Sequence, residues 1–172
     1  MMKRLLVVAA LAISTAFASA QSGGFGTPVN LSVRVGFVYS LDDFTRDIMD
    51  NMIGVGAEYY LDRSLFEGGE TTLSFDWMGR GLNGDKGNMF PIMLNQRWYV
   101  GGDFESANRR YYYIGAGIAV IDVVSTNTVA AARVGIGQEM GQHIFGELTL
   151  VYSDSSSGAR ATSVGAYVGY RF

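Results

Sequence analysis

The chain has 172 residues, with 13 basic and 16 acidic side chains and a formal net charge of −3 at pH 7. This acidic balance argues against a nucleic-acid-binding protein, and the lack of cysteine excludes disulfides as a source of stability. Glycine, at 23 residues, is about twice as frequent as usual without a collagen-like period, so the excess needs another structural reason.

The first twenty residues have the pattern of an export signal. Lys3 and Arg4 precede an apolar run from Leu5 to Ile13, and Ala18, Ser19 and Ala20 form a small-residue cleavage site. A membrane-spanning helix needs about 20 apolar residues, and this run is shorter. We therefore expect a signal peptide over residues 1–20, a short N-terminal segment over 21–28 and one domain over 29–172.

The rest of the chain alternates apolar and polar residues with a period of two, which is typical of strands with one apolar and one polar face. Glycine-rich and acidic stretches interrupt the alternation and mark turns and loops. The pattern predicts eight strands, over residues 29–39, 52–61, 71–78, 89–99, 111–121, 128–140, 144–152 and 162–172. Their lengths suit tilted strands of a membrane barrel, and no further apolar run could form a spanning helix.

Alternation alone fits a membrane barrel with its apolar face outside or a soluble lipocalin-like barrel with its apolar face inside. A water-facing wall normally carries many lysines, but after the signal the sequence contains only Lys86, in a predicted loop. Aromatic residues of the apolar face also cluster near the strand ends, as interfacial aromatic belts do. One belt would hold Phe37, Tyr39, Trp77, Phe90 and Tyr152, and the other Tyr59, Trp98, Tyr112, Tyr170 and Phe172.

These features favour the membrane barrel. They predict that the following side chains face lipid near the middle of the bilayer: Val33, Val55, Ile114, Val134, Leu148 and Val168.

The polar face combines glycines with a few charged residues. Its charged members are Arg34, Glu58, Asp76, Arg97, Arg133, Glu139, Glu147 and Arg171. Because the lumen of an eight-stranded barrel is only wide enough for side chains to fill it, we expect these charges to pair as a structural network that closes the lumen. Strand direction predicts Arg34, Asp76 and Arg133 near the middle and the other five toward the rim opposite the long loops. Independent solvated charges in a wet channel are the alternative.

The export signal, the eight alternating strands, the long connections after every odd-numbered strand and the ending Val168-Gly-Tyr-Arg-Phe172 resemble the small outer-membrane barrel family that includes the OmpA membrane domain and OmpX-like proteins. The resemblance implies a bacterial outer-membrane location, contact with membrane lipids and insertion by the barrel-assembly machinery, which reads the strand ending in Phe172. It implies roles in envelope integrity, adhesion or small-solute passage. The connections after the second and fourth predicted strands are longer than is usual in that family.

We expect a monomer with no nucleic-acid partner and, since no segment follows Phe172, no peptidoglycan-binding domain. Any extracellular ligand would bind the outward loops, because rigid strands position variable loops for recognition. These loops are residues 40–51, 79–88, 122–128 and 153–160.

A lipid-modifying barrel enzyme would need a nucleophile within hydrogen-bond reach of a base. His143 is the only histidine, and the serine cluster lies at the far end of the adjoining strand, about 30 Å away at ~3.3 Å per residue. That cluster comprises Ser153, Ser155, Ser156 and Ser157. Ser64 and Ser106 share the rim of His143 but belong to no catalytic motif.

The aspartates of residues 40–51 lack the spacing of a calcium-binding loop, and the Arg109–Tyr113 stretch fits an interface anchor better than a nucleic-acid stacking site. The sequence therefore predicts no catalytic, cofactor or metal site. The predicted function is a non-enzymatic structural or surface-interaction role. A narrow pore, a lipid-modifying barrel enzyme and a soluble lipocalin-like carrier are the alternatives.

Overall fold

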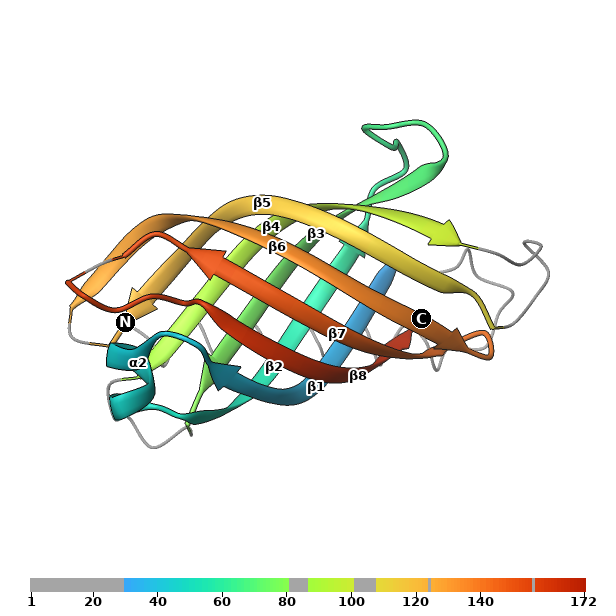
Figure 1. The fold of residues 1–172 in the computed structure, drawn as a ribbon. Helices are drawn as coiled ribbons and strands as arrows, with labels where there is room; N and C mark the ends of the chain where they lie inside the picture. The colour runs from blue at the N-terminus through green and yellow to red at the C-terminus, as the bar shows by residue number, and fades with distance from the viewer. Residues whose placement is uncertain (1–29, 81–86, 101–107, 124, 156) are drawn as a thin grey trace. The chain divides into compact units, whose positions relative to one another are not determined.

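The computed structural model describes residues 30–80, 87–100, 108–123, 125–155 and 157–172. Its eight strands form one closed antiparallel barrel in which each strand pairs with its neighbours in sequence and β8 pairs with β1 (Figure 1). The strands are β1 (Leu31–Ser40), β2 (Asn51–Tyr60), β3 (Gly69–Gly79), β4 (Asn88–Val100), β5 (Arg110–Asp122), β6 (Thr126–Met140), β7 (Ile144–Ser153) and β8 (Ser163–Arg171). The eight-stranded antiparallel up-and-down barrel expected from the sequence is thus confirmed.

The strand boundaries differ from the predicted ones by at most two residues. β3 begins at Gly69 and β6 at Thr126, before the alternation becomes clear, whereas β8 begins and ends one residue inside its predicted range. Closing a barrel from tilted strands staggers their ends, so the ladder of backbone hydrogen bonds extends beyond the alternating stretch in some strands. Residues 1–29, including the expected signal peptide and Val29, lie outside the described residues.

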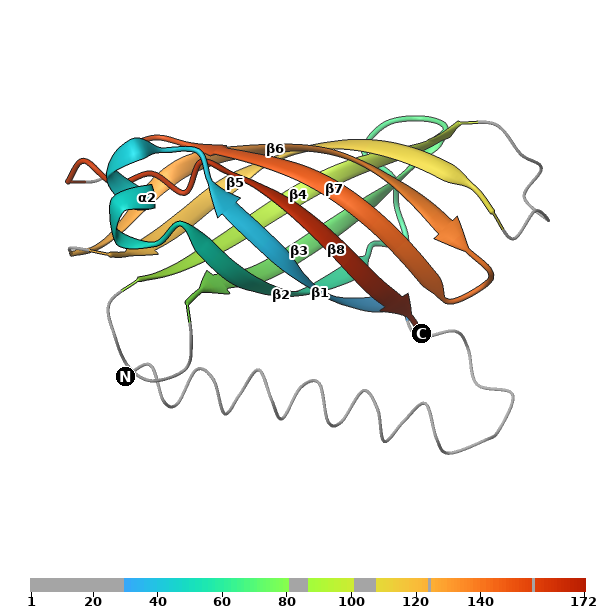
Figure 2. The same ribbon diagram turned by 60° about the horizontal axis from the view of Figure 1, so that its bottom comes forward.

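A short helix, α2 (Asp43–Ile48), occupies part of the predicted loop 40–51, where the sequence pattern indicated no helix. Asp42 caps it, because its carboxylate accepts hydrogen bonds from the Thr45 backbone N–H at 3.0 Å and from the Thr45 hydroxyl at 2.8 Å. Figure 2 shows α2 between β1 and β2 at one end of the barrel. Among the described residues, no helix combines the length and apolar character needed to cross a bilayer.

The period of two separates the two faces of the wall. Outward-facing large apolar residues are exposed on every strand, up to 80 % for Phe37. The exposed aromatic residues Tyr39 and Tyr152 lie near the strand ends on the α2 side, and Tyr59, Tyr112 and Tyr170 lie near the opposite ends. Most inward-facing residues are buried, so the packed core of this protein is the lumen itself.

The lumen has an apolar half that the alternation did not predict. Buried methionines and small apolar residues fill the end that reaches the connection after α2. Met78 and Met89 are direct partners across β3 and β4. A flexible, unbranched methionine side chain fills irregular gaps. The sequence did contain a signal for this apolar half, because most of the buried methionines lie on the otherwise polar face of their strands. The methionines of the buried cluster are Met49, Met52, Met78, Met89 and Met93.

Candidate functional site

Six charged side chains from six different strands meet inside the barrel. Each residue is at most 4 % exposed. They are Arg34 of β1, Glu58 of β2, Asp76 of β3, Arg97 of β4, Arg133 of β6 and Glu147 of β7. All six lie on the inward parity of their strands. We call these six residues the lumen cluster.

Asp76 joins two of the arginines. Its Oδ1 accepts hydrogen bonds from Arg34 Nε at 3.0 Å and Arg34 Nη2 at 2.8 Å, and its Oδ2 lies 2.9 Å from the same Nη2. Arg133 Nη2 donates to the other side of the carboxylate, and Arg133 Nη1 donates to Ser74 Oγ at 3.0 Å. Forked guanidinium–carboxylate contacts of this kind are among the strongest hydrogen bonds in proteins.

Glu58 and Arg97 form the second ion pair of the cluster. Arg97 Nη2 lies 2.7 Å from Glu58 Oε2, and Arg97 Nη1 donates to the Tyr60 hydroxyl at 2.7 Å. The other oxygen of Glu58 accepts from the Thr72 hydroxyl at 2.8 Å and from Asn95 Nδ2 at 3.3 Å. The Glu58 carboxylate therefore has partners on both oxygens, as a buried charge requires.

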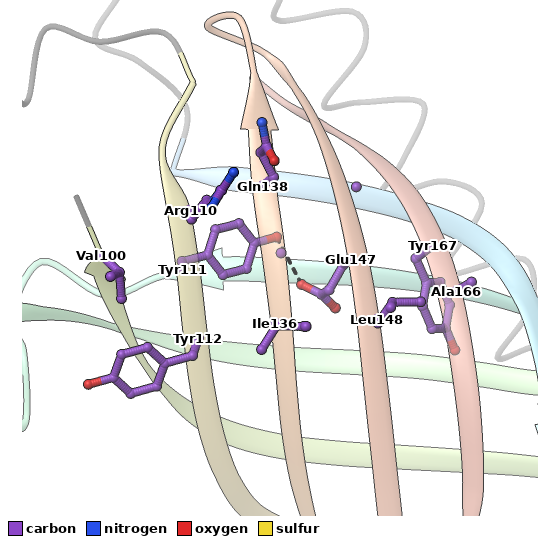
Figure 3. A pocket seen from close by; sticks show the side chains of 12 residues that line it. Val100, Arg110, Tyr111, Tyr112, Ile136, Gln138, Glu147, Leu148, Ala166 and Tyr167 are labelled. Carbon is purple, nitrogen blue, oxygen red and sulfur yellow. Dashed lines mark hydrogen bonds between the residues drawn. The ribbon is translucent and has the colours of Figure 1, made fainter. Parts of the chain in front are cut away.

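Glu147 connects the two ion pairs. It accepts hydrogen bonds from Arg34 Nη1, from the Tyr113 hydroxyl at 2.7 Å and from the Tyr111 hydroxyl at 3.1 Å. Figure 3 shows the last of these bonds as the dashed line between Tyr111 on β5 and Glu147 on β7. Arg97 Nη2 lies 3.9 Å from Glu147 Oε2, so the charges form one continuous network.

Tyrosine rings enclose the arginines. The guanidinium carbon of Arg97 lies 4.2 Å from the centre of the Tyr111 ring, and that of Arg34 lies 5.1 Å from the centre of the Tyr167 ring. Cations over aromatic faces are stabilised most when water is excluded. When Tyr111 on β5 and Tyr167 on β8 are added to the lumen cluster, each of the eight strands contributes a side chain to the group that fills the lumen.

Glycines make room for these large side chains. A Cβ atom at Gly56 would stand 2.0 Å from Asp76 Oδ1, and one at Gly135 would stand 2.4 Å from the Tyr113 ring. The high glycine content therefore has a structural reason, since the wall must be thin where the lumen is crowded. Positive and negative members of the lumen cluster are equal in number, so their formal charges cancel.

The structure places the remaining two predicted network residues, Glu139 and Arg171, in a separate group at the rim opposite α2. Arg109 Nε donates to Glu139 Oε2 at 2.7 Å, and Arg171 lies 3.5 Å from Glu70 and 3.7 Å from Glu139. Tyr99 donates to Glu70 at 2.8 Å and accepts from Arg171 at 3.4 Å. Glu58, Arg97 and Glu147, expected at this rim, instead join the buried residues Arg34, Asp76 and Arg133.

The rim group is more exposed than the lumen cluster, with 26 % of the Arg171 side chain open to solvent. Burial alone acts to lower the pKa of Arg109, but the hydrogen bond to Glu139 and the nearby Tyr99 and carboxylates outweigh it, so the pKa lies above its ordinary value. Sequence reasoning missed Arg109 and Glu70, because both lie at strand ends, where the alternation no longer assigns a face.

The candidate catalytic residues have other partners. His143 contacts the backbone oxygen of Arg171 through Nδ1 at 2.8 Å and stacks on the Tyr170 ring, with the centres 5.2 Å apart. Ser64 contacts Gln96 and Phe66. Ser106 and Ser156 lie outside the described residues. Within the described part of the chain, no set of three His, Cys, Asp or Glu side chains is grouped to hold a metal ion.

A groove of about 610 Å³ lies on the outer side of the wall and runs across β5 to β8 (Figure 3). Its outer lining includes Tyr112, Ile136, Leu148 and Ala166, and Gly137 and Gly146 thin the wall beneath it. Apart from Arg110 and Gln138, this outer lining is apolar.

The solved structures that are similar to this chain include the following two. The N-terminal β-barrel domain of Pseudomonas aeruginosa OprF shares 17 % sequence identity, covers 85 % of this chain and 100 % of its own, and superposes with a TM-score of 0.48. Neisserial surface protein A shares 8 % identity, covers 86 % and 100 %, and has the same TM-score. No protein-family model matches the sequence, and no curated protein matches it.

Proposed function

We propose that this protein is a monomeric, non-enzymatic integral barrel of the bacterial outer membrane with a structural or surface-interaction role. The observation that carries this proposal is the apolar outer wall, which runs around all eight strands. Within these strands, all of which the structure describes, the only charged residues on the outward parity are Arg110 and Asp122, at the two ends of β5. Soluble proteins rarely expose an apolar surface of this extent.

The interior argues against the soluble carrier. A lipocalin-like barrel encloses its ligand in a cavity lined by apolar side chains. Here the lumen cluster, with Tyr111, Tyr113 and Tyr167, occupies one half, and buried methionines occupy the other. Ion pairs inside the barrel and valine, leucine and tyrosine outside are the arrangement that suits surrounding lipid. In lipid the backbone groups of every strand must also form their hydrogen bonds within the closed ladder, as they do here.

The same interior favours a closed barrel over a narrow pore. Arg97 and Glu147 are almost completely buried, and the network around them spans the lumen from β1 to β8. Moving a hydrated solute past this level would separate ion pairs that are shielded from water, which costs several kcal/mol per charge. We therefore assign any recognition to the loops.

The α2 end supplies an ordered platform for such recognition. The Thr45 hydroxyl oxygen lies 3.0 Å from the Arg160 carbonyl oxygen and accepts from the Arg160 N–H at 3.1 Å. This contact ties the connection after β1 to the connection after β7, although 115 residues separate the two. In this proposal these connections face the cell exterior, and the barrel-assembly machinery recognises the β8 strand that leads to Phe172.

Fractionation of cells that express the full chain tests the proposal. We expect the protein in the outer-membrane fraction after alkaline extraction of peripheral proteins. We also expect a thiol-reactive dye to label a cysteine at Asp154 from outside intact cells, while a cysteine at Val168 reacts only after the membrane is dissolved. Recovery as a soluble protein with both sites reactive would overturn the membrane assignment.

A further inference from the structure

One polar pair on the outer wall is buried although its neighbours are exposed. Thr71 of β3 and Gln96 of β4 are direct cross-strand partners, and both lie on the outward parity, next to the exposed Leu73 and Leu94. Yet Thr71 is 0 % exposed and Gln96 is 4 % exposed. Polar groups left on a lipid-facing wall would lose their hydrogen bonds to water. The segment that covers this pair must therefore supply hydrogen-bond partners in place of water.

The covering segment is the connection between β2 and β3, residues 61–68. The Leu65 N–H donates to Thr71 Oγ1 at 2.8 Å, and Thr71 Oγ1 donates to Gln96 Oε1 at 2.6 Å. Gln96 Nε2 donates to Ser64 Oγ at 2.9 Å and lies 3.4 Å from the Phe66 carbonyl oxygen. Since these partners face outward, the connection lies against the outside of the wall and does not cross the barrel mouth.

The far side of this connection is apolar. Leu65 and Phe66 are 61 % and 60 % exposed. The Phe66 ring lies 6.4 Å from the Trp98 ring, which stacks on the Tyr112 ring at 5.4 Å. The connection therefore extends the apolar outer wall, and Figure 1 shows it on the outside of the barrel beside the start of β3.

We propose that residues 61–68 form a lipid-facing flap, which satisfies the polar Thr71–Gln96 pair with its backbone and the Ser64 hydroxyl and inserts Leu65 and Phe66 into the membrane leaflet at the barrel end opposite α2. This inference rests on the proposed membrane location. Continuity with the apolar wall identifies lipid as the partner. The exposed Arg63 and Glu67 beside the two apolar residues keep the flap at the level of the headgroups, because charged heads stay in water while their stems lie along apolar surface.

Site-specific fluorescence in vesicles tests the flap. The chain has no cysteine, so Leu65→Cys and Phe66→Cys each give one labelling site for an environment-sensitive nitrobenzoxadiazole dye. The labelled proteins are folded into phosphatidylcholine vesicles and exposed either to brominated phosphatidylcholine or to aqueous iodide. Val168→Cys on the barrel wall and Asp154→Cys in the connection after β7 serve as controls.

We expect brominated lipid to quench the dyes at positions 65 and 66 at least threefold more strongly than it quenches the dye at 154, and iodide to show the opposite order. The dye at 168 should behave like those at 65 and 66. If the dye at 168 is quenched by lipid while those at 65 and 66 are quenched by iodide, the flap is overturned and the membrane barrel stands. If iodide quenches all four, the proposed function itself fails.

Discussion

Arg97 of β4 reaches past β3 to Glu58 of β2, so that Nη2 and Oε2 lie 2.7 Å apart, although 39 residues separate them and their strands do not pair with each other. Curvature makes this contact possible, because inward side chains of non-adjacent strands converge in a narrow barrel. Both partners are buried, so each needs the other to offset its loss of hydration.

Removal of one carboxylate from the lumen cluster should strongly destabilise the barrel. Glu147→Ala deprives Arg34 of one partner and leaves the Tyr111 and Tyr113 hydroxyls without their acceptor. We expect the free energy of unfolding, measured by urea titration in vesicles, to fall by about 3–5 kcal/mol. Arg171→Ala, in the more exposed rim group, should cost about 1 kcal/mol or less. Equal losses for the two variants would contradict the distinction between the two groups.

The proposed closed lumen predicts that the unmodified protein does not conduct steadily. Single-channel recording in planar bilayers should show no sustained open level, because the lumen cluster and the tyrosines around it are buried and span the lumen from β1 to β8. The double variant Arg97→Ala with Glu147→Ala removes a cation and an anion together and should increase the frequency of openings. Large, long-lived currents in the unmodified protein would favour the narrow pore.

A charge on the outer wall should be costly under the proposed membrane location. Val168 is exposed on the outward parity of β8, so Val168→Arg would then place a guanidinium in hydrocarbon. We expect a loss of about 2–4 kcal/mol in the free energy of folding into vesicles. Val168→Leu is the matched control, since it keeps the side chain apolar, and it should change stability by less than about 0.5 kcal/mol. If Val168→Arg left the free energy of folding unchanged, the result would indicate that this wall faces water.

The crowded glycines should not tolerate a methyl group. In Gly56→Ala the new Cβ would meet Asp76 Oδ1 at 2.0 Å, so Asp76 would have to move away from Arg34. Overpacking of this kind typically costs about 1–3 kcal/mol. Gly146→Ala is the control, because its nearest neighbour is the mobile end of Met140 at 3.6 Å. The two variants should therefore differ clearly in urea midpoint, and similar midpoints would refute the packing argument.

Thr45 should determine how firmly the α2 connection is held. Thr45→Val keeps the shape of the side chain but removes the hydroxyl that bonds Asp42 and Arg160. The local opening free energy of α2 should fall by about 1–3 kcal/mol, because buried groups lose their partners. Hydrogen exchange of residues 43–48 measures this change. The barrel strands serve as the internal control, and their exchange should stay as in the unmodified protein.

The sequence by itself determined the number of strands, their approximate bounds and the face on which the residues of each alternating stretch lie. Val33, Val35 and Phe37 against Arg34 and Gly36 illustrate why, because the side-chain period of an extended chain is two whatever the neighbouring strands are. The closure of the barrel was expected from the same pattern, because closing the sheet leaves no edge strand with unpaired backbone N–H and C=O groups.

Only the tertiary structure decided which inward residues meet. Arg34 and Glu147 are 113 residues apart, and their contact depends on the register and tilt that set the height of each side chain in the lumen. The same register separated Glu139 and Arg171 from the lumen cluster and brought the methionines together. The burial of the outward Thr71–Gln96 pair beneath residues 61–68 was likewise decided in three dimensions, because alternation assigns a residue to a face but does not reveal what covers it.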